Sequence, residues 1–159
     1  MDPAMVTSLK TFKIGNFFFA DGIADMSEDD AQRQIAGDIN PPLWLAGHLL
    51  DCRKYLLDLF GEEREMPFGM IFREKYDPSV EYPTMAEIKA KWVEISDELF
   101  EKIEAASDDH FLKEIDWNLP NGDKTVRGAI LFYTYHEGYH MGQIAYAKRG
   151  MGLKGLVPY

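Results

Sequence analysis

The histidines of this 159-residue chain carry its clearest chemical signal. His136 and His140 are four residues apart, so in a helix their imidazoles lie one turn apart on the same face. His48 stands in a second apolar segment, beside Leu45 and Leu49. Imidazoles on buried faces need polar partners, because an unpaired buried polar group costs about 1–3 kcal/mol. A divalent ion would supply that partner, and the pattern predicts a metal site of His48, His136 and His140.

An ordinary structural interpretation of these histidines stays open. A single inward histidine is more often a core residue bonded to a carbonyl, and a pair at helical spacing is common by chance. The fourth histidine, His110, follows two aspartates at an expected helix end. We expect it at the surface rather than as a fourth ligand.

The segment His136-Glu137-Gly138-Tyr139-His140 also matches the H-E-x-x-H signature of zinc proteases, in which the glutamate is the general base. Such enzymes take a third ligand downstream, and residues 141–159 contain no His, Asp or Glu. A protease is therefore disfavoured. Glu137 stays a candidate catalytic base, or is a partly exposed acid beside the site.

Residues close to the three histidines have more than one interpretation. Asp51, three residues after His48, is better placed to accept a hydrogen bond from an imidazole N–H than to bind metal, though either role is open. Cys52 could point into the same space, but a small buried hydrophobe is the better interpretation. Three aromatic residues lie within a turn of the ligands and either shape a pocket or simply pack: Trp44, Tyr133 and Tyr139.

Four long segments with apolar residues at steps of three and four predict the helices that position these side chains. They run from about Met5 to Ala24, from Pro41 to Phe60, from Thr84 to Ala106 and from Thr125 to Gly150. In the first segment Phe17 and Phe18 widen the apolar face. Thr84 and Glu87 form a capping box at the start of the third. The expected inward residues of that third helix are Ile88, Trp92, Ile95, Leu99 and Ile103.

Shorter elements are expected between these helices. Ser27 and the acids after it predict a short helix that ends near Gly37. The long connection 61–83 is expected to pack partly against the core through Phe68, Ile71, Phe72 and Tyr76. Alternating apolar residues at 115, 117 and 119, before Pro120-Asn121-Gly122-Asp123, suggest a hairpin or extended arm. The sequence thus predicts one all-α domain over residues 1–159, a four-helix bundle with a long crossover.

Composition limits the possible partners and location. The net charge is −10, which disfavours binding to a phosphate backbone, and the basic tail with Lys148, Arg149 and Lys154 is a weak footprint for nucleic acid. The single cysteine cannot form an intramolecular disulfide, which fits a reducing cytoplasm. We find neither a signal peptide nor the roughly 18 apolar residues of a membrane span. We therefore expect a cytoplasmic protein that binds neither nucleic acid nor membrane.

Two motifs together resemble the DinB-like (DinB/YfiT) superfamily of metal-dependent enzymes. They are Pro42-Leu43-Trp44-Leu45-Ala46-Gly47-His48-Leu49-Leu50-Asp51 and His136-Glu137-Gly138-Tyr139-His140-Met141-Gly142-Gln143-Ile144. The resemblance implies a bundle of up-down-down-up order, a homodimer, and a divalent metal held by three histidines that fall at His48, His136 and His140. Characterised members include thiol transferases that use low-molecular-weight bacterial thiols, and a mycothiol-dependent isomerase.

The expected function follows from three neutral imidazoles that leave an ion with an open position. Such an ion lowers the pKa of bound water toward about 7 and deprotonates a bound thiol. We expect a metal-dependent thiol transferase or hydrolase acting on a small molecule, with zinc as the ion and nickel as the alternative. The rival hypotheses are a non-catalytic, metal-stabilised dimeric binding or stress-response module, and a metal-free helical dimer whose histidines are structural.

Overall fold

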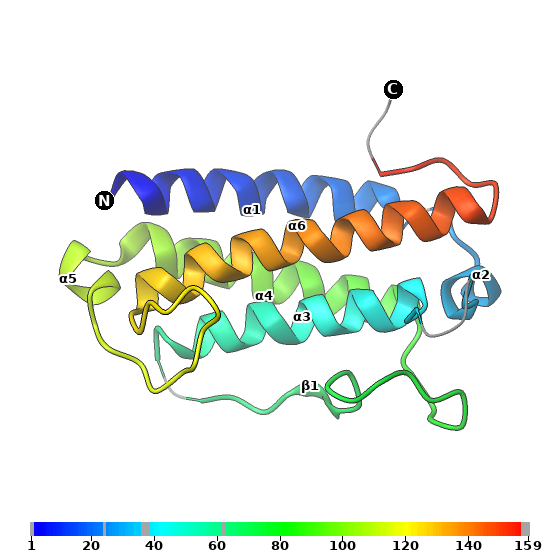
Figure 1. Ribbon diagram of the computed structural model, residues 1–159, viewed down its shortest axis with the longest axis horizontal. Helices are drawn as coiled ribbons and strands as arrows, with labels where there is room; N and C mark the ends of the chain where they lie inside the picture. The colour runs from blue at the N-terminus through cyan, green and yellow to red at the C-terminus, as the bar shows by residue number, and fades with distance from the viewer. Residues whose placement is uncertain (1, 24, 36–38, 62, 157–159) are drawn as a thin grey trace.

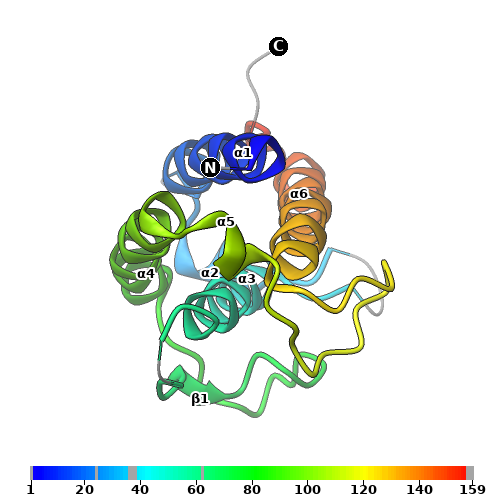
Figure 2. The same cartoon turned by 90° about the vertical axis from the view of Figure 1, so that its left-hand side faces the viewer.

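Four long helices form a bundle in which the chain runs up, down, down and up (Figure 1). The computed structural model describes residues 2–23, 25–35, 39–61 and 63–156. The long helices are α1 (Pro3–Gly22), α3 (Pro42–Asp58), α4 (Met85–Ala105) and α6 (Val126–Gly150). Figure 2 shows them around a common axis, with α1 next to α4 and α6, and α3 next to the same two helices. The predicted all-α class and helix order are confirmed.

In the described part of the chain, three shorter elements lie between these helices. They are α2 (Glu28–Gln32), β1 (Pro67–Met70) and α5 (Asp108–Phe111). The short helix predicted after Ser27 is present as α2, but its predicted end near Gly37 is wrong. The helix ends at Gln32, and the backbone of Arg33 is already extended. Only Ala31 of this helix is buried, so no apolar face extends it further. Ala24 and Gly37, the predicted ends of the first two helices, lie outside the described residues.

The predicted hairpin before the last helix is a closed loop. The amide of Ile115 donates to the Lys124 carbonyl at 2.9 Å, and one antiparallel bridge pairs Glu114 with Thr125. Gly122 takes a positive φ of 72° at the turn, where a residue with a side chain would be strained. Thr125 then caps α6 by accepting a hydrogen bond from the amide of Gly128 at 3.1 Å. The loop therefore fixes where α6 begins.

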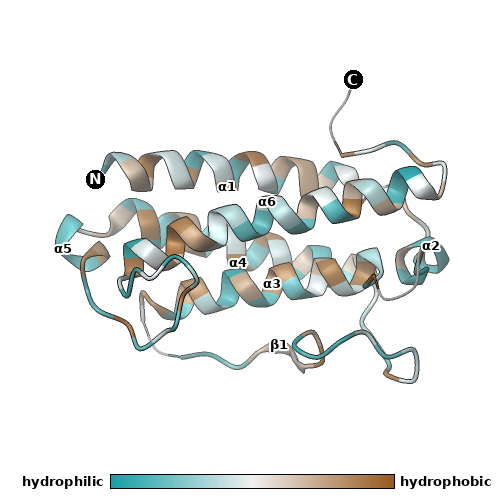
Figure 3. Ribbon diagram, in the orientation of Figure 1, coloured by the Kyte–Doolittle hydropathy of each residue, from teal (hydrophilic) through white to brown (hydrophobic). Residues whose placement is uncertain are grey.

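Most predicted core positions are buried. All five inward residues expected in α4 have less than a tenth of their surface exposed, and the capping box at Thr84 and Glu87 is present. Hydrophobic and hydrophilic residues recur in turn along the long helices (Figure 3), as expected of helices that bury one side in a core. The prediction for Phe17 is wrong, because this side chain is 61% exposed whereas Phe18 packs against the core. Within the described residues, no helix is long and apolar enough to cross a membrane.

The crossover between α3 and α4 is anchored by Phe72, which is fully buried. Its ring lies directly on Gly47 of α3, and a Cβ atom at that glycine would overlap the ring. The glycine thus permits the close approach that brings the crossover backbone next to α3. As expected from the sequence, Phe68, Ile71 and Tyr76 also pack against the core.

A buried arginine ties the four long helices together. Arg53 of α3 is 1% exposed, and its Nε and Nη2 groups donate to the two carboxylate oxygens of Glu137 in α6 at 2.9 and 2.7 Å. Its guanidinium carbon lies 3.7 Å from the ring centroid of Trp92. The remaining donors bond to acceptors on α1 and α4, namely the Phe12 carbonyl, Asn16 Oδ1 and Ser96 Oγ. All five N–H groups of the guanidinium are therefore satisfied.

We expect Arg53→Met to lower the free energy of unfolding by about 3–5 kcal/mol, because it leaves the buried Glu137 carboxylate without its counter-charge. Urea unfolding followed by circular dichroism measures this. The matched control is Lys13→Met, which removes the half-exposed Lys13–Glu104 ion pair and should cost about 1 kcal/mol or less. Equal losses in the two variants would contradict a special role for the buried pair.

Candidate metal centre

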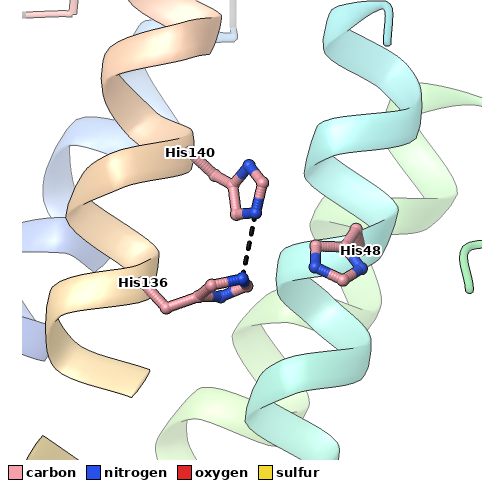
Figure 4. Close-up of side chains that lie close together, drawn as sticks. All are labelled: His48, His136 and His140. Atoms are coloured by element: carbon pink, nitrogen blue, oxygen red, sulfur yellow. Dashed lines mark hydrogen bonds between the residues drawn. The ribbon is translucent and has the colours of Figure 1, made fainter. Parts of the chain in front are cut away.

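Three imidazoles meet between α3 and α6, and Figure 4 shows their side chains pointing toward one another. The Nε2 atoms of His136 and His140 are 3.1 Å apart. One nitrogen from each of these two rings and from His48 lies within 4.8 Å of the others. Two nitrogens that share a tetrahedral zinc ion lie about 3.3 Å apart, so the α6 pair has the spacing of two ligands of one ion. Among the described residues, this group contains no carboxylate and no thiol.

Hydrogen bonds on the far side of two rings orient them. Nδ1 of His48 lies 3.1 Å from the Phe72 carbonyl, and Nδ1 of His140 lies 2.6 Å from Oε1 of Gln143. These oxygens are acceptors, so each Nδ1 carries the proton and each Nε2 keeps a lone pair for a cation. Gln143 is itself held, because its Nε2 donates to the Tyr139 hydroxyl at 3.2 Å. The donor set and its orientation therefore fit a divalent metal ion.

Burial keeps the three imidazoles neutral. It is the main cause that lowers the pKa of His48, His136 and His140 below the usual histidine value. Burial lowers the pKa of His136 to about 4, and the charges that His140 and His48 would carry when protonated add to this effect. At neutral pH all three rings are thus in the unprotonated form that binds metal.

The buried thiol of Cys52 points at the histidines. Its Sγ lies 3.7 Å from Nε2 of His48 and 3.8 Å from Nδ1 of His136. Burial raises the pKa of this thiol, which holds it protonated. Both parts of the sequence interpretation apply, since Cys52 is buried in the bundle and also faces the site.

Asp51 does not take the role expected of it. The oxygen that orients His48 is the Phe72 carbonyl, while both carboxylate oxygens of Asp51 are buried without a hydrogen-bond partner. Burial raises the pKa of Asp51 from its ordinary 3.8 to about 7, and the positive charges of Arg73 and Lys54 oppose that rise only in part.

Glu137 is held away from base chemistry by its ion pair. The residue is 6% exposed, and both of its carboxylate oxygens accept hydrogen bonds from Arg53. It is therefore not the partly exposed acid considered from the sequence, and each of its oxygens already accepts a hydrogen bond from a buried cation. We correct its assignment from candidate base to structural partner of Arg53.

His110 and the aromatic candidates have clear places. His110 is half-buried rather than at the surface, and its Nε2 donates to the Leu59 carbonyl at 3.0 Å, which ties α5 to the end of α3. Trp44 stacks on His48 with ring centroids 5.0 Å apart. The Tyr133 ring lies 5.7 Å from His136, and the Tyr139 ring lies 5.0 Å from His140. All three aromatic candidates thus border the imidazoles.

A pocket of about 580 Å³ opens beside the histidines, within the usual size range of small-molecule sites. We call it the aromatic pocket. Two of its lining residues, Phe132 and Tyr133, also contact the His136 ring, at centroid distances of 5.6 and 5.7 Å. Its lining is Tyr55, Asp58, Leu59, Glu63, Arg73, Trp117, Asn118, Leu119, Pro120, Phe132 and Tyr133.

Sequence reasoning missed three residues that shape the site. Gln143 had a signal, because it lies three residues after His140 and so one turn along the same helix face. Arg53 also had one, as a charge between the apolar residues Leu49 and Leu56 at helical spacing. Phe72 had none, because its contribution to His48 is a backbone carbonyl, which every residue carries.

Of the three basic residues in the tail, Arg149 and Lys154 are exposed, whereas Lys148 is not part of the surface. Lys148 is 1% exposed, and its ammonium donates to the Gly22 carbonyl and to Oδ1 of Asp25. Its charge is therefore used inside the fold, where it ties the end of α6 to the end of α1.

One comparison with known proteins bears on this site. The sequence model described as the DinB superfamily matches residues 20–144, which is 125 of the 159 residues and includes all three clustered histidines. The search of curated proteins found no match.

We expect Asp51→Asn to change the pH dependence of stability. The folded-state pKa of Asp51 lies above its ordinary value, so the folded protein binds more protons than the unfolded chain and loses stability as pH rises from about 4 through about 7. Measured with chelator present, the variant should gain about 2–4 kcal/mol relative to the wild type between pH 4 and pH 8. The control is Asp97→Asn, an exposed acid of α4. A constant difference between wild type and Asp51→Asn across this range would refute the assignment.

Proposed function

The chain belongs to the DinB superfamily, and from the geometry of its histidines we propose that it is a metal-dependent thiol transferase that acts on a small molecule. His48, His136 and His140 hold the divalent ion in this proposal. The observation that carries it is the convergence of three neutral imidazoles, with no carboxylate joining them in the described part of the chain. Three neutral ligands leave the positive charge of an ion undiminished and leave it an open position for a substrate atom.

We favour zinc as the ion. Zinc accepts imidazole nitrogen, tolerates three protein ligands plus one exchangeable position, and needs no particular d-electron geometry. Nickel is the alternative, since imidazole also suits it.

Thiol transfer fits the residues better than hydrolysis. When bound, a divalent ion supplies a Lewis acid that lowers the pKa of a coordinated thiol. The thiol proton then leaves to solvent, the sulfur electron pair forms the new carbon–sulfur bond, and the leaving group of the electrophile departs with its bonding pair. Hydrolysis would benefit from a general base beside the site, and the nearest acid in sequence, Glu137, is occupied by Arg53. A thiol of low molecular weight requires no such base.

One observation favours a second candidate, a non-catalytic module stabilised by its metal. Cys52 Sγ lies 3.7 and 3.8 Å from nitrogens of two of the histidines. A small movement would let it become a fourth ligand, and a closed shell of four protein ligands is typical of structural zinc sites. The role of Cys52 therefore separates the two candidates.

The metal and the reaction can be tested together. We expect purified wild-type protein to carry close to one divalent ion per chain by elemental mass spectrometry, and to accelerate conjugation of a model thiol with a model electrophile. His140→Ala should lose most of the ion and reduce the rate to background, because it removes one of three ligands. The matched control is His110→Ala, which removes the histidine outside the cluster and should keep both.

Two further measurements decide between the candidates. Cys52→Ala should keep its ion and its activity if the protein is an enzyme with an open position, and should lose metal affinity if the site is closed. Activity that persists after chelation would rule out the proposed role of the ion. Full metal content in His140→Ala would rule out the ligand set.

We further propose that the protein is a cytoplasmic homodimer that pairs through the outer face of α6. This face carries an exposed stripe of Leu131, Tyr135, Gly138, Gly142 and Tyr146, with no charged residue among them. Both glycines lack a side chain and border open space, so the backbone of a second copy can approach this face closely. Ile14 and Phe17 of the neighbouring α1 are also more than half exposed. Two copies of a chain with net charge −10 repel one another, which favours contact through an uncharged apolar face.

We expect wild-type protein to be dimeric by light scattering after size exclusion, and Tyr135→Glu to have the mass of one chain, because the new charge would be buried in the interface. The control is Leu112→Glu, which places the same charge at an exposed apolar position on the loop after α5. A monomeric wild type, or an unchanged mass in Tyr135→Glu, would overturn this interface.

A further inference from the structure

The aromatic pocket lies one helical turn from the metal centre along α6 and two turns along α3. Tyr133 precedes His136 by three residues, and Tyr55 follows His48 by seven. The pocket contacts the His136 ring through Phe132 and Tyr133. None of the three histidines lines the pocket itself. A molecule bound there would thus sit beside the histidines with no need to bind an ion.

The charges of the pocket are uneven. Arg73 is the single cation of its lining, is exposed, and forms no hydrogen bond or ion pair with its side chain in the described part of the chain. Its guanidinium carbon lies 5.4 Å from the Tyr55 ring centroid, so an aromatic face supports it at the pocket. Burial raises the pKa of Asp51, and the positive charge of Arg73 opposes that rise. The carboxylate oxygens of Asp51 are buried and form no hydrogen bond with the guanidinium.

The two acids of the lining do not cancel this cation. Asp58 is paired with the Lys54 ammonium at 2.8 Å. Glu63 is exposed, and no ion pair within 4 Å joins it to Arg73. The guanidinium therefore keeps its donors for a ligand, and its planar fork matches a carboxylate.

The remaining surface of the pocket suits an apolar group. Trp117 and Tyr133 meet edge to face at a centroid distance of 6.2 Å, and Phe132 lies 5.2 Å from Tyr133. Such rings contribute dispersion and apolar burial with little loss of side-chain freedom. A ligand that fills the pocket would place this apolar part beside His136 and its charged end at Arg73.

We propose that the aromatic pocket binds a small molecule with a carboxylate and an apolar body, and that Arg73 selects the carboxylate. This deepens the proposed function, since the bound molecule would be the electrophile or the thiol. It rests on that function only for the role of the ligand, because the binding itself uses no metal ligand.

The test uses 3-phenylpropionate as the probe and its neutral amide as the comparison. A carboxylate could also bind an ion directly, so we choose metal-stripped His140→Ala as the parent protein, with chelated wild type as the second background. Binding is followed by the change in tryptophan fluorescence, to which Trp117 in the lining of the pocket contributes. We expect the acid to bind about tenfold tighter than the amide.

Added in that background, Arg73→Gln should lose about tenfold in affinity for the acid and change the amide little. The matched control is Arg64→Gln, which removes a nearby positive charge that pairs with Glu98 and does not line this pocket. Glu63→Gln should strengthen binding of the acid by about two- to threefold, because it removes a repelling charge at the rim.

Equal binding of acid and amide, or an equal effect of Arg73→Gln and Arg64→Gln, would overturn the proposal. These outcomes are independent of the proposed function. If the protein binds no metal or catalyses no conjugation, the probe still binds and only the function fails. If conjugation depends on the ion but Arg73→Gln does not change the affinity for 3-phenylpropionate, only the proposal of a carboxylate-binding pocket is rejected.

Discussion

The buried pair of Arg53 and Glu137 is the constraint on which the rest of the structure depends. Arg53 follows His48 by five residues on α3, and Glu137 directly follows His136 on α6. A bidentate contact permits little sliding or rotation between two helices, because both nitrogen–oxygen distances must stay short. Once Glu137 faces into the bundle, helical geometry turns His136 and His140 toward α3. The same contact that closes the core thus brings the three imidazoles together.

The fold was largely predictable because its long helices follow one rule. An apolar stripe with a period near 3.6 residues marks each of them, and caps at Thr84 and Thr125 mark two of their starts. The predictions were wrong where few buried apolar residues define a helix face. The short α2 has one buried residue and ends before its expected position, and Phe17 follows the helical pattern too loosely to be placed on either face. The crossover was expected to pack through Phe72, but that it packs on Gly47 is a tertiary contact no local pattern encodes.

The features of the site that depend on sequence spacing were predictable, and those that depend on tertiary contacts were not. The four-residue spacing of His136 and His140 places them on one helix face. His48 was identified because it is a polar residue within an apolar segment, and the structure brings all three together. The role of Glu137 could not be read from the H-E-x-x-H motif, because the motif says nothing of an arginine 84 residues away. Asp51 was misjudged for a related reason. Its expected partner, His48, is bonded instead to the Phe72 carbonyl, and a backbone acceptor leaves no trace in side-chain identity.

The crossover makes the site more than a product of two helices. Trp44 stacks on one face of His48, and the Phe72 carbonyl fixes the proton on its Nδ1. The carbonyl reaches that position only because the Phe72 ring sits where Gly47 has no side chain. Arg73 is the next residue along the chain, so the segment that orients His48 also carries the cation of the aromatic pocket. Displacing Phe72 would therefore change the orientation of the His48 imidazole and the position of the Arg73 guanidinium together, even if the helices that carry the histidines did not move.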